Sequence, residues 1–158
     1  SRVTQLYRGP LFLRGFDDDI RHTLADEMIR AGIDLRFRTN IRALARTADG
    51  LAVTLDDGST LQADAVMAAT GRAPLTADLG LEATGVTLDG NGAVVVDADQ
   101  RTSVATIYAV GDCTNRLNLT PVAIREGHAL ADSLFGPKAA RADHEGVPTA
   151  VFSQPPPR

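Results

Sequence analysis

This chain of 158 residues has one cysteine, no long apolar run and no apolar stretch at its start. Its only cysteine is Cys113, so an internal disulfide is impossible, which suits a reducing compartment. No apolar run approaches the ~20 residues that a membrane-spanning helix needs, so we expect no membrane association. If the chain starts at residue 1, the opening stretch SRVTQLYRG lacks the apolar core of a signal peptide. These absences together favour a cytoplasmic protein.

The chain also lacks an excess of positive charge. Its formal net charge is −4, and affinity for nucleic acid rests on accumulated Lys and Arg, so we expect no nucleic-acid partner. The first 46 residues are nevertheless rich in arginine, which can form a solvated surface or hold one small anion. With 44% hydrophobic and 23% charged residues, the composition is that of an ordinary globular chain of one domain or two small incomplete ones.

The first half of the sequence predicts an α/β arrangement. Residues 2–7 and 33–38 are rich in strand-forming side chains, and residues 16–32 between them read as a helix with acids in its first turn. A strand–helix–strand order predicts a crossover onto a parallel sheet. Residues 41–64 alternate around Asp-Gly signals, as in an antiparallel meander, and the apolar run 65–69 predicts a strand buried on both faces.

The sequence changes in character near residue 70, after TGRAP, from regular predicted elements to a loop-like stretch. Residues 75–103 are loop-like apart from a predicted strand at 93–97, and a second buried strand is predicted at 106–110. A helix is predicted over 120–136, with Thr120 as N-cap and Pro121 as its first residue. The final stretch VPTAVFSQPPP is expected to begin a strand and to stop at its prolines. The two halves therefore belong to different units.

The stretch IYAVGDC, residues 107–113, is the first candidate site. Ligands of open α/β sheets lie beyond the carboxyl ends of the strands, where Gly111 would allow close approach and Asp112 could accept hydrogen bonds from sugar or polyol hydroxyls. A turn acid that only caps a loop fits the local pattern equally well. Cys113 could be a nucleophile, but no histidine stands in a recognisable relation to it, which favours a small buried thiol.

Two further features lie near predicted strand ends. Thr120 opens a helix eight residues after Asp112, and a helix N-terminus can hold an anionic or carbonyl oxygen, although it can also be a well-capped core helix. Arg8 and Arg14 flank the end of the first strand, where a dinucleotide fold uses arginine to accommodate a 2′-phosphate. Ordinary surface arginine is the simpler interpretation. The sequence has no GxGxxG, so pattern alone does not establish a dinucleotide site.

Four ordered motifs carry a resemblance that covers essentially the whole chain. LYRGPLFLRGFDDDIR, AATGRAP, TSVATIYAVGDC and LNLTPVAIREGHALADSLFG, in this order, resemble the glutathione reductase family of FAD-dependent pyridine nucleotide–disulfide oxidoreductases. The fold that this resemblance implies is α/β. Residues 1–70 would form the second half of a Rossmann-like NADPH-binding domain, residues 71–146 the returning segment of a Rossmann-like FAD-binding domain, and residues 147–158 the start of a dimerisation domain.

The resemblance also implies roles for single residues. Arg8 and Arg14 match the pair that binds the 2′-phosphate of NADPH, Gly71 matches a hinge glycine that contacts the cofactor, and Asp112 matches the acid that binds the ribityl chain of FAD. Thr120 and its helix match the N-terminus that faces the flavin N1–C2=O edge, where charge develops on reduction. Asn118 and Ala150 match positions that line the nicotinamide end of the coenzyme. His128 departs from the family pattern, because many members have at this position an arginine that contacts the substrate glutathione.

The function implied is NADPH-dependent reduction of glutathione disulfide by a homodimer, of which this chain resembles the central third. Both glycine-rich loops, the redox-active CxxxxC pair and the catalytic His–Glu pair of such enzymes are missing, so we expect no catalytic residue in this chain and no activity of the chain alone. A trypanothione reductase, or another relative with an altered disulfide pocket, is an alternative, because His128 departs from the pattern of many glutathione reductases. Lipoamide dehydrogenase fits less well, since an acid is expected at Tyr7. A non-catalytic remnant is the alternative from another class.

Overall fold

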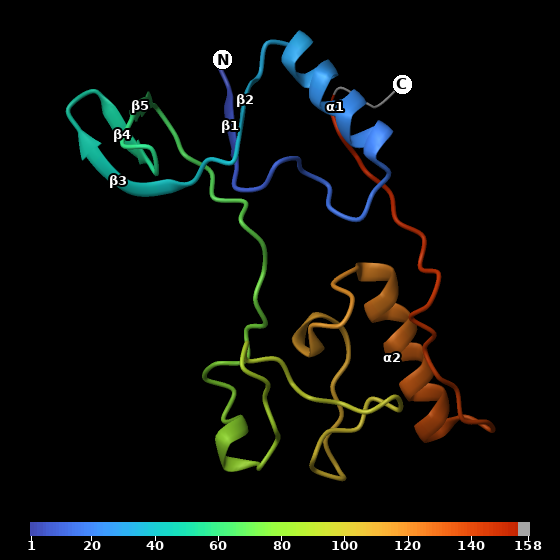
Figure 1. The fold of residues 1–158 in the computed structure, drawn as a ribbon. Helices are drawn as coiled ribbons and strands as arrows, with labels where there is room; N and C mark the ends of the chain where they lie inside the picture. The colour runs from blue at the N-terminus through green and yellow to red at the C-terminus, as the bar shows by residue number, and fades with distance from the viewer. Residues whose placement is uncertain (155–158) are drawn as a thin grey trace. The chain divides into compact units, whose positions relative to one another are not determined.

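The computed structural model describes residues 1–154, which form two compact units. Unit 1 contains Ser1–Ala69 with the segment from Thr149 on, and unit 2 contains Thr70–Pro148. Figure 1 shows the course of the chain through these units. Among the described residues no helix is long and apolar enough to span a membrane.

Unit 1 begins with the predicted strand–helix–strand arrangement. Strand β1 (Thr4–Tyr7) pairs in parallel with β2 (Asp34–Phe37), and helix α1 (Asp18–Arg30) connects them (Figure 1). The Asp17 carboxylate accepts a hydrogen bond of 2.9 Å from the Asp19 N–H and caps the helix, as acids at this position do. The predictions of these three elements and of their parallel pairing are confirmed.

The core of unit 1 lies between α1 and the loop that precedes it. Leu11 and Phe12 of this loop are buried together with Leu24 and Ala25 of the helix. Partly buried apolar side chains pack around this cluster, including Phe37, whose ring centroid lies 5.7 Å from that of Phe12. The loop that carries Arg8 and Arg14 is therefore anchored at its middle by buried side chains.

The rest of unit 1 is the predicted antiparallel meander. Strands β3 (Ile41–Thr47), β4 (Gly50–Leu55) and β5 (Thr60–Ala63) follow one another in a three-stranded sheet. Gly50 has a φ of +130°, and a Cβ there would lie 2.8 Å from the Ala63 carbonyl oxygen, so the turn into β4 requires glycine.

The predicted buried strand at 65–69 is wrong. Residues 65–69 form no strand, and Met67 is 87% exposed. A strand is stable only when neighbouring backbones take up its N–H and C=O groups, and no described strand lies alongside this run. A continuous apolar run gives no information on whether such a neighbour exists.

Unit 2 is built from loops, two short 3₁₀ turns and one helix. The turns are η1 (Leu81–Ala83) and η2 (Gly111–Thr114), and the helix is α2 (Thr120–Phe135). The helix is confirmed, but its N-cap is Leu119, so Thr120 is its first residue and the prediction of Thr120 as N-cap is wrong by one position. The backbone of Leu119 is still extended (φ −129°, ψ 131°), and its carbonyl accepts the first helical hydrogen bonds.

The strands predicted at 93–97 and 106–110 are also wrong. Val94 and Tyr108 each form an isolated bridge, with Leu88 and Arg101 respectively, and no ladder follows. The adjacent backbone groups bond to loops instead: the Val95 N–H donates to the Thr87 carbonyl at 3.0 Å. The backbone groups of these apolar segments form single hydrogen bonds and no continuous ladder. A local sequence pattern does not distinguish this arrangement from strand pairing.

The strand expected to begin in VPTAVFSQPPP is absent from residues 147–154. The proline end of that stretch lies outside the described residues.

Candidate functional site

The turn η2 places Asp112 beside the start of α2. Gly111 opens the turn with a φ of +74°, and a Cβ there would lie 3.0 Å from the Ala123 Cβ, so the glycine lets the turn pack directly on the helix. The Thr114 hydroxyl donates to the Gly111 carbonyl at 2.8 Å and closes the turn from the other end. The backbone on both sides of Asp112 is thus fixed.

The side chain of Asp112 is free to receive a ligand. It is 48% exposed, and its only ion partner among residues 1–154 is Arg72, whose Nε lies 3.8 Å from Oδ2. This separation is too long for a hydrogen bond, and Arg72 is itself 81% exposed. The carboxylate can therefore accept hydrogen bonds from ligand hydroxyl groups without breaking a strong internal contact.

The first N–H groups of α2 lie close to η2 along the chain. A helix leaves its first N–H groups without intrahelical acceptors, and the α2 N-terminus carries the positive end of the helix dipole. Pro121 has no N–H, and the Val122 N–H already donates to the Leu119 carbonyl at 3.0 Å, so the N–H of Thr120 is the one left for a ligand. Asn118, which is exposed, donates through its side chain to Asn115 at 3.1 Å.

Glu126 is the site residue that sequence reasoning missed. Its carboxylate is only 1% exposed, and its Oε2 accepts a hydrogen bond of 2.6 Å from the Gly111 N–H. A signal for it was available: Val122, Glu126 and Ala129 recur at helical spacing and share the buried face of α2. An acid on an apolar helix face must have partners in the fold.

Cys113 has the properties of a structural thiol. It is partly buried, and its Sγ lies 3.2 Å from the Val110 carbonyl oxygen, as a weak donor would. Burial raises the pKa of the thiol above its ordinary value, and the charges of Glu126 and Asp112 raise this pKa further. A thiol with a raised pKa is a poor nucleophile at neutral pH, so the geometry favours the interpretation of Cys113 as a structural residue.

The other sequence-predicted residues lie at several places. Arg8 and Arg14 are exposed in the loop between β1 and α1 of unit 1. Gly71, with a φ of +120°, precedes Arg72 at the start of unit 2. His128 is exposed on α2, eight residues after Thr120 and thus about 12 Å further along the helix, and Ala150 is exposed in the segment assigned to unit 1. Within unit 2, Asp112 lies 3.8 Å from Arg72, the neighbour of Gly71, and Asn118 bonds to Asn115 at the end of η2.

Comparison with known proteins identifies the family of this chain. Residues 1–127 match the pyridine nucleotide-disulphide oxidoreductase family. A glutathione reductase of Burkholderia cepacia is 58% identical over 153 residues, which are 97% of this chain and 34% of that relative. A trypanothione reductase of Trypanosoma congolense is 45% identical over 157 residues, or 99% of this chain and 32% of the relative.

Solved structures agree with these sequence relatives. The HOCl-induced flavoprotein disulfide reductase RclA of Escherichia coli matches with a TM-score of 0.84 and 30% identity, over 90% of this chain and 32% of that one. LpdA of Mycobacterium tuberculosis matches with a TM-score of 0.87 and 30% identity, over 97% of this chain and 33% of that one. The chain spans about a third of the length of these relatives. The ordered motifs and the α/β fold thus have one explanation: the chain belongs to the pyridine nucleotide-disulphide oxidoreductase family.

Proposed function

We propose that this chain is part of a cytoplasmic, NADPH-dependent FAD enzyme that reduces glutathione disulfide to glutathione and acts as a homodimer. The observation that carries the proposal is the position of Asp112, a half-exposed carboxylate fixed by a glycine turn beside a helix N-terminus. The 58% identity to a glutathione reductase supports this choice within the family. Bound FAD would pass the two electrons of NADPH on to the disulfide.

The residues of unit 2 fit a flavin coenzyme. Asp112 would accept hydrogen bonds from hydroxyls of the ribityl chain, and the N-terminus of α2 at Thr120 would stabilise negative charge at the N1–C2=O edge of the flavin. Gly71 would allow close approach of the backbone to the coenzyme at its positive φ. In this proposal residues 71–146 are the returning segment of the FAD domain.

The residues of unit 1 fit the coenzyme NADPH. Arg8 and Arg14 are exposed cations in one loop, and the planar guanidinium group binds phosphate oxygens in pairs. In this proposal residues 1–70 are the second half of the NADPH domain, residues 147–158 start the dimerisation domain, and Asn118 and Ala150 line the nicotinamide end.

The disulfide substrate is best tested by direct competition. With NADPH, the full-length protein is expected to reduce glutathione disulfide with a kcat/KM at least about tenfold above that for trypanothione disulfide, a difference of about 1.4 kcal/mol. The reverse order would assign the protein to the trypanothione reductase type. This alternative has support from the 45% identity to a trypanothione reductase and from His128, which stands where many glutathione reductases have a substrate-contacting arginine.

The remnant hypothesis has its own test, the intact mass of the native gene product. A mass about three times the 16.7 kDa of this chain supports the enzyme, and a mass of 16.7 kDa supports a remnant. Residues 1–158 alone, mixed with NADPH, FAD and glutathione disulfide, are expected to give no turnover above the protein-free background. Turnover by this polypeptide would show that it contains catalytic groups that we have not identified.

A further inference from the structure

We propose that Glu126 is a positioning residue for Asp112, because its buried carboxylate holds the turn from which Asp112 reaches the flavin coenzyme. This inference rests on the proposed function, since it needs Asp112 to bind the ribityl chain of FAD. It goes further by assigning a role to an acid that itself lies too deep to touch a ligand, with 1% of its side chain exposed.

The contact between Glu126 and the turn is short and direct. Oε2 of Glu126 accepts the Gly111 N–H at 2.6 Å, and Gly111 is the residue before Asp112. A carboxylate that accepts a backbone N–H forms a charge-assisted hydrogen bond, which is stronger than one between neutral groups. The orientation of the Val110–Gly111 peptide, which lies one residue before Asp112, is therefore coupled to the position of α2.

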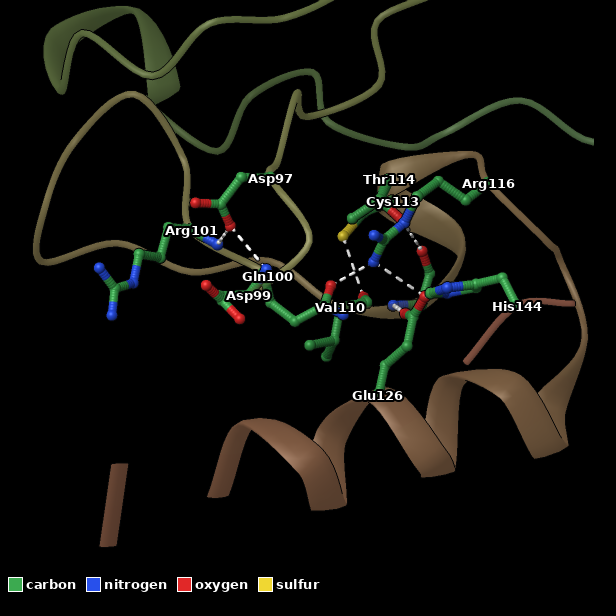
Figure 2. A network of polar contacts seen from close by, with 11 residues as sticks. Asp97, Asp99, Gln100, Arg101, Val110, Cys113, Thr114, Arg116, Glu126 and His144 are labelled. Carbon is green, nitrogen blue, oxygen red and sulfur yellow. Dashed lines mark hydrogen bonds and ion pairs between the residues drawn. The ribbon is translucent and has the colours of Figure 1, made fainter. Parts of the chain in front are cut away.

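The other oxygen of Glu126 is held by two basic groups. Arg116 donates through Nη2 to Oε1 at 2.9 Å, and the His144 ring Nε2 lies 2.7 Å from the same oxygen (Figure 2). Arg116 Nη2 also donates to Oε1 of Gln100, a residue that is 2% exposed. A buried carboxylate is tolerated only when it is paired and hydrogen-bonded, and these partners meet that condition.

The network leaves the turn little freedom. A Cβ at Gly111 would lie 3.0 Å from the Ala123 Cβ of the helix, the Gly111 carbonyl accepts from the Thr114 hydroxyl, and the Gly111 N–H donates to Glu126. If Glu126 is removed, the buried Gly111 N–H loses its acceptor and the turn must shift to find another. A shift of the turn moves Asp112 away from the hydroxyls that it is proposed to bind.

A purely structural role and a positioning role for Glu126 predict different effects on FAD affinity when Asp112 is absent. If Glu126 only stabilises unit 2, its loss lowers FAD affinity equally whether or not Asp112 is present. If Glu126 acts through Asp112, its effect on FAD affinity disappears once Asp112 is alanine. A double-mutant cycle in the full-length protein separates the two roles.

The experiment measures the FAD dissociation constant of deflavinated full-length protein by flavin fluorescence. The variants are Glu126→Gln, Glu126→Ala and the control Glu82→Gln, an exposed acid of η1, each made with Asp112 and with Asp112→Ala. With Asp112 present, Glu126→Ala is expected to weaken FAD binding about tenfold and Glu126→Gln about threefold, because glutamine keeps an oxygen for the Gly111 N–H. With Asp112→Ala, neither change at Glu126 should weaken binding further.

Equal losses in the two backgrounds would overturn the positioning role, as would unchanged FAD affinity of Glu126→Gln and Glu126→Ala. If Glu126→Ala does not fold, the test rests on Glu126→Gln, whose FAD affinity is compared with Asp112 and with Asp112→Ala. A different result would contradict the proposed function itself. If Asp112→Ala alone leaves the FAD affinity unchanged, Asp112 does not bind FAD, whatever the variants of Glu126 show.

Discussion

Arg21 of α1 donates through Nε to the Phe12 carbonyl at 2.8 Å and through Nη2 to the Leu11 carbonyl at 2.9 Å. Its side chain is only 16% exposed, so these are partly buried, charge-assisted hydrogen bonds to the loop between β1 and α1. The same loop carries Arg8 and Arg14. Arg21 therefore connects the helix to the loop in which the coenzyme phosphate is proposed to bind.

Loss of this connection should loosen the loop. Arg21→Ala removes both hydrogen bonds and is expected to destabilise unit 1 by about 2–3 kcal/mol, read as faster hydrogen exchange in residues 8–17 of the full-length protein. The matched control is Arg30→Ala on the same helix, which loses only an exposed pair with Glu27 and about 0.5 kcal/mol or less. Equal exchange in the two variants would contradict the anchoring role of Arg21.

The preference for NADPH should depend on Arg8 and Arg14. Arg8→Ala with Arg14→Ala is expected to lower kcat/KM with NADPH on the order of 10²- to 10⁴-fold and to leave kcat/KM with NADH almost unchanged, because NADH has no 2′-phosphate. Tyr7 stands where an NADH enzyme of this family is expected to have an acid, so the site also lacks repulsion toward the phosphate.

The control for this pair is Arg42→Ala with Arg46→Ala. Both arginines are exposed on β3 and their loss changes the net charge equally, but they lie outside the proposed site. A matching loss of NADPH use in this control would indicate a general effect of charge. An equal loss with NADPH and NADH in the Arg8 and Arg14 variant would show that these arginines support the fold.

Cys113 should react slowly with alkylating reagents near neutral pH. Burial raises the pKa of its thiol, so the reactive thiolate is scarce until the pH exceeds the ordinary thiol value of about 8.5. Mass spectrometry of the peptide that contains Cys113 should show iodoacetamide labelling with its midpoint at a higher pH than that of glutathione in the same buffer. A labelling midpoint below that of glutathione would contradict this, and loss of activity in Cys113→Ser would reopen the nucleophile hypothesis.

The pKa of Asp99 should lie below the ordinary value of an aspartate side chain. Hydrogen bonds from Arg141, at 2.5 and 2.9 Å, lower the pKa of this carboxyl below 3.8, and the charge of Arg101 adds a smaller effect in the same direction. Since the folded pKa is the lower one, the stabilisation by this pair is complete above the unfolded pKa and is lost as the pH falls through the folded pKa. NMR titration with ¹³C-labelled aspartate should show a larger upward shift of this pKa in Arg141→Ala than in Arg101→Ala. The opposite order would contradict the assignment.

The parts of the fold that could be predicted are those in which the order of elements along the chain determines which strands pair, as in the parallel pair β1 and β2 on either side of α1. The meander of β3, β4 and β5 is read from alternation and Asp-Gly turns, because each strand pairs with the next one along the chain. The runs at 65–69, 93–97 and 106–110 have strand-forming side chains but no neighbouring strand among the described residues, and composition does not report a missing neighbour.

The candidate site was predictable only in part, for a related reason. Asp112 could be proposed from the sequence, because a glycine and an acid after an apolar run are visible in seven residues. Glu126 was not found, because its partners Gly111, Arg116 and His144 are separated from it by 10 to 18 residues and meet it only in the folded unit. Its helical spacing with Val122 and Ala129 was the only local sign of burial.

The most direct test of the account is the FAD affinity of Asp112→Ala in the full-length protein. A charge-assisted hydrogen bond to a hydroxyl contributes about 1.5–3 kcal/mol, so the dissociation constant of FAD should rise roughly tenfold to a hundredfold. Asp132→Ala, which removes an exposed acid from α2, should retain the wild-type value. Wild-type affinity in Asp112→Ala, or an equal loss in Asp132→Ala, would contradict the assignment of Asp112 to the flavin site.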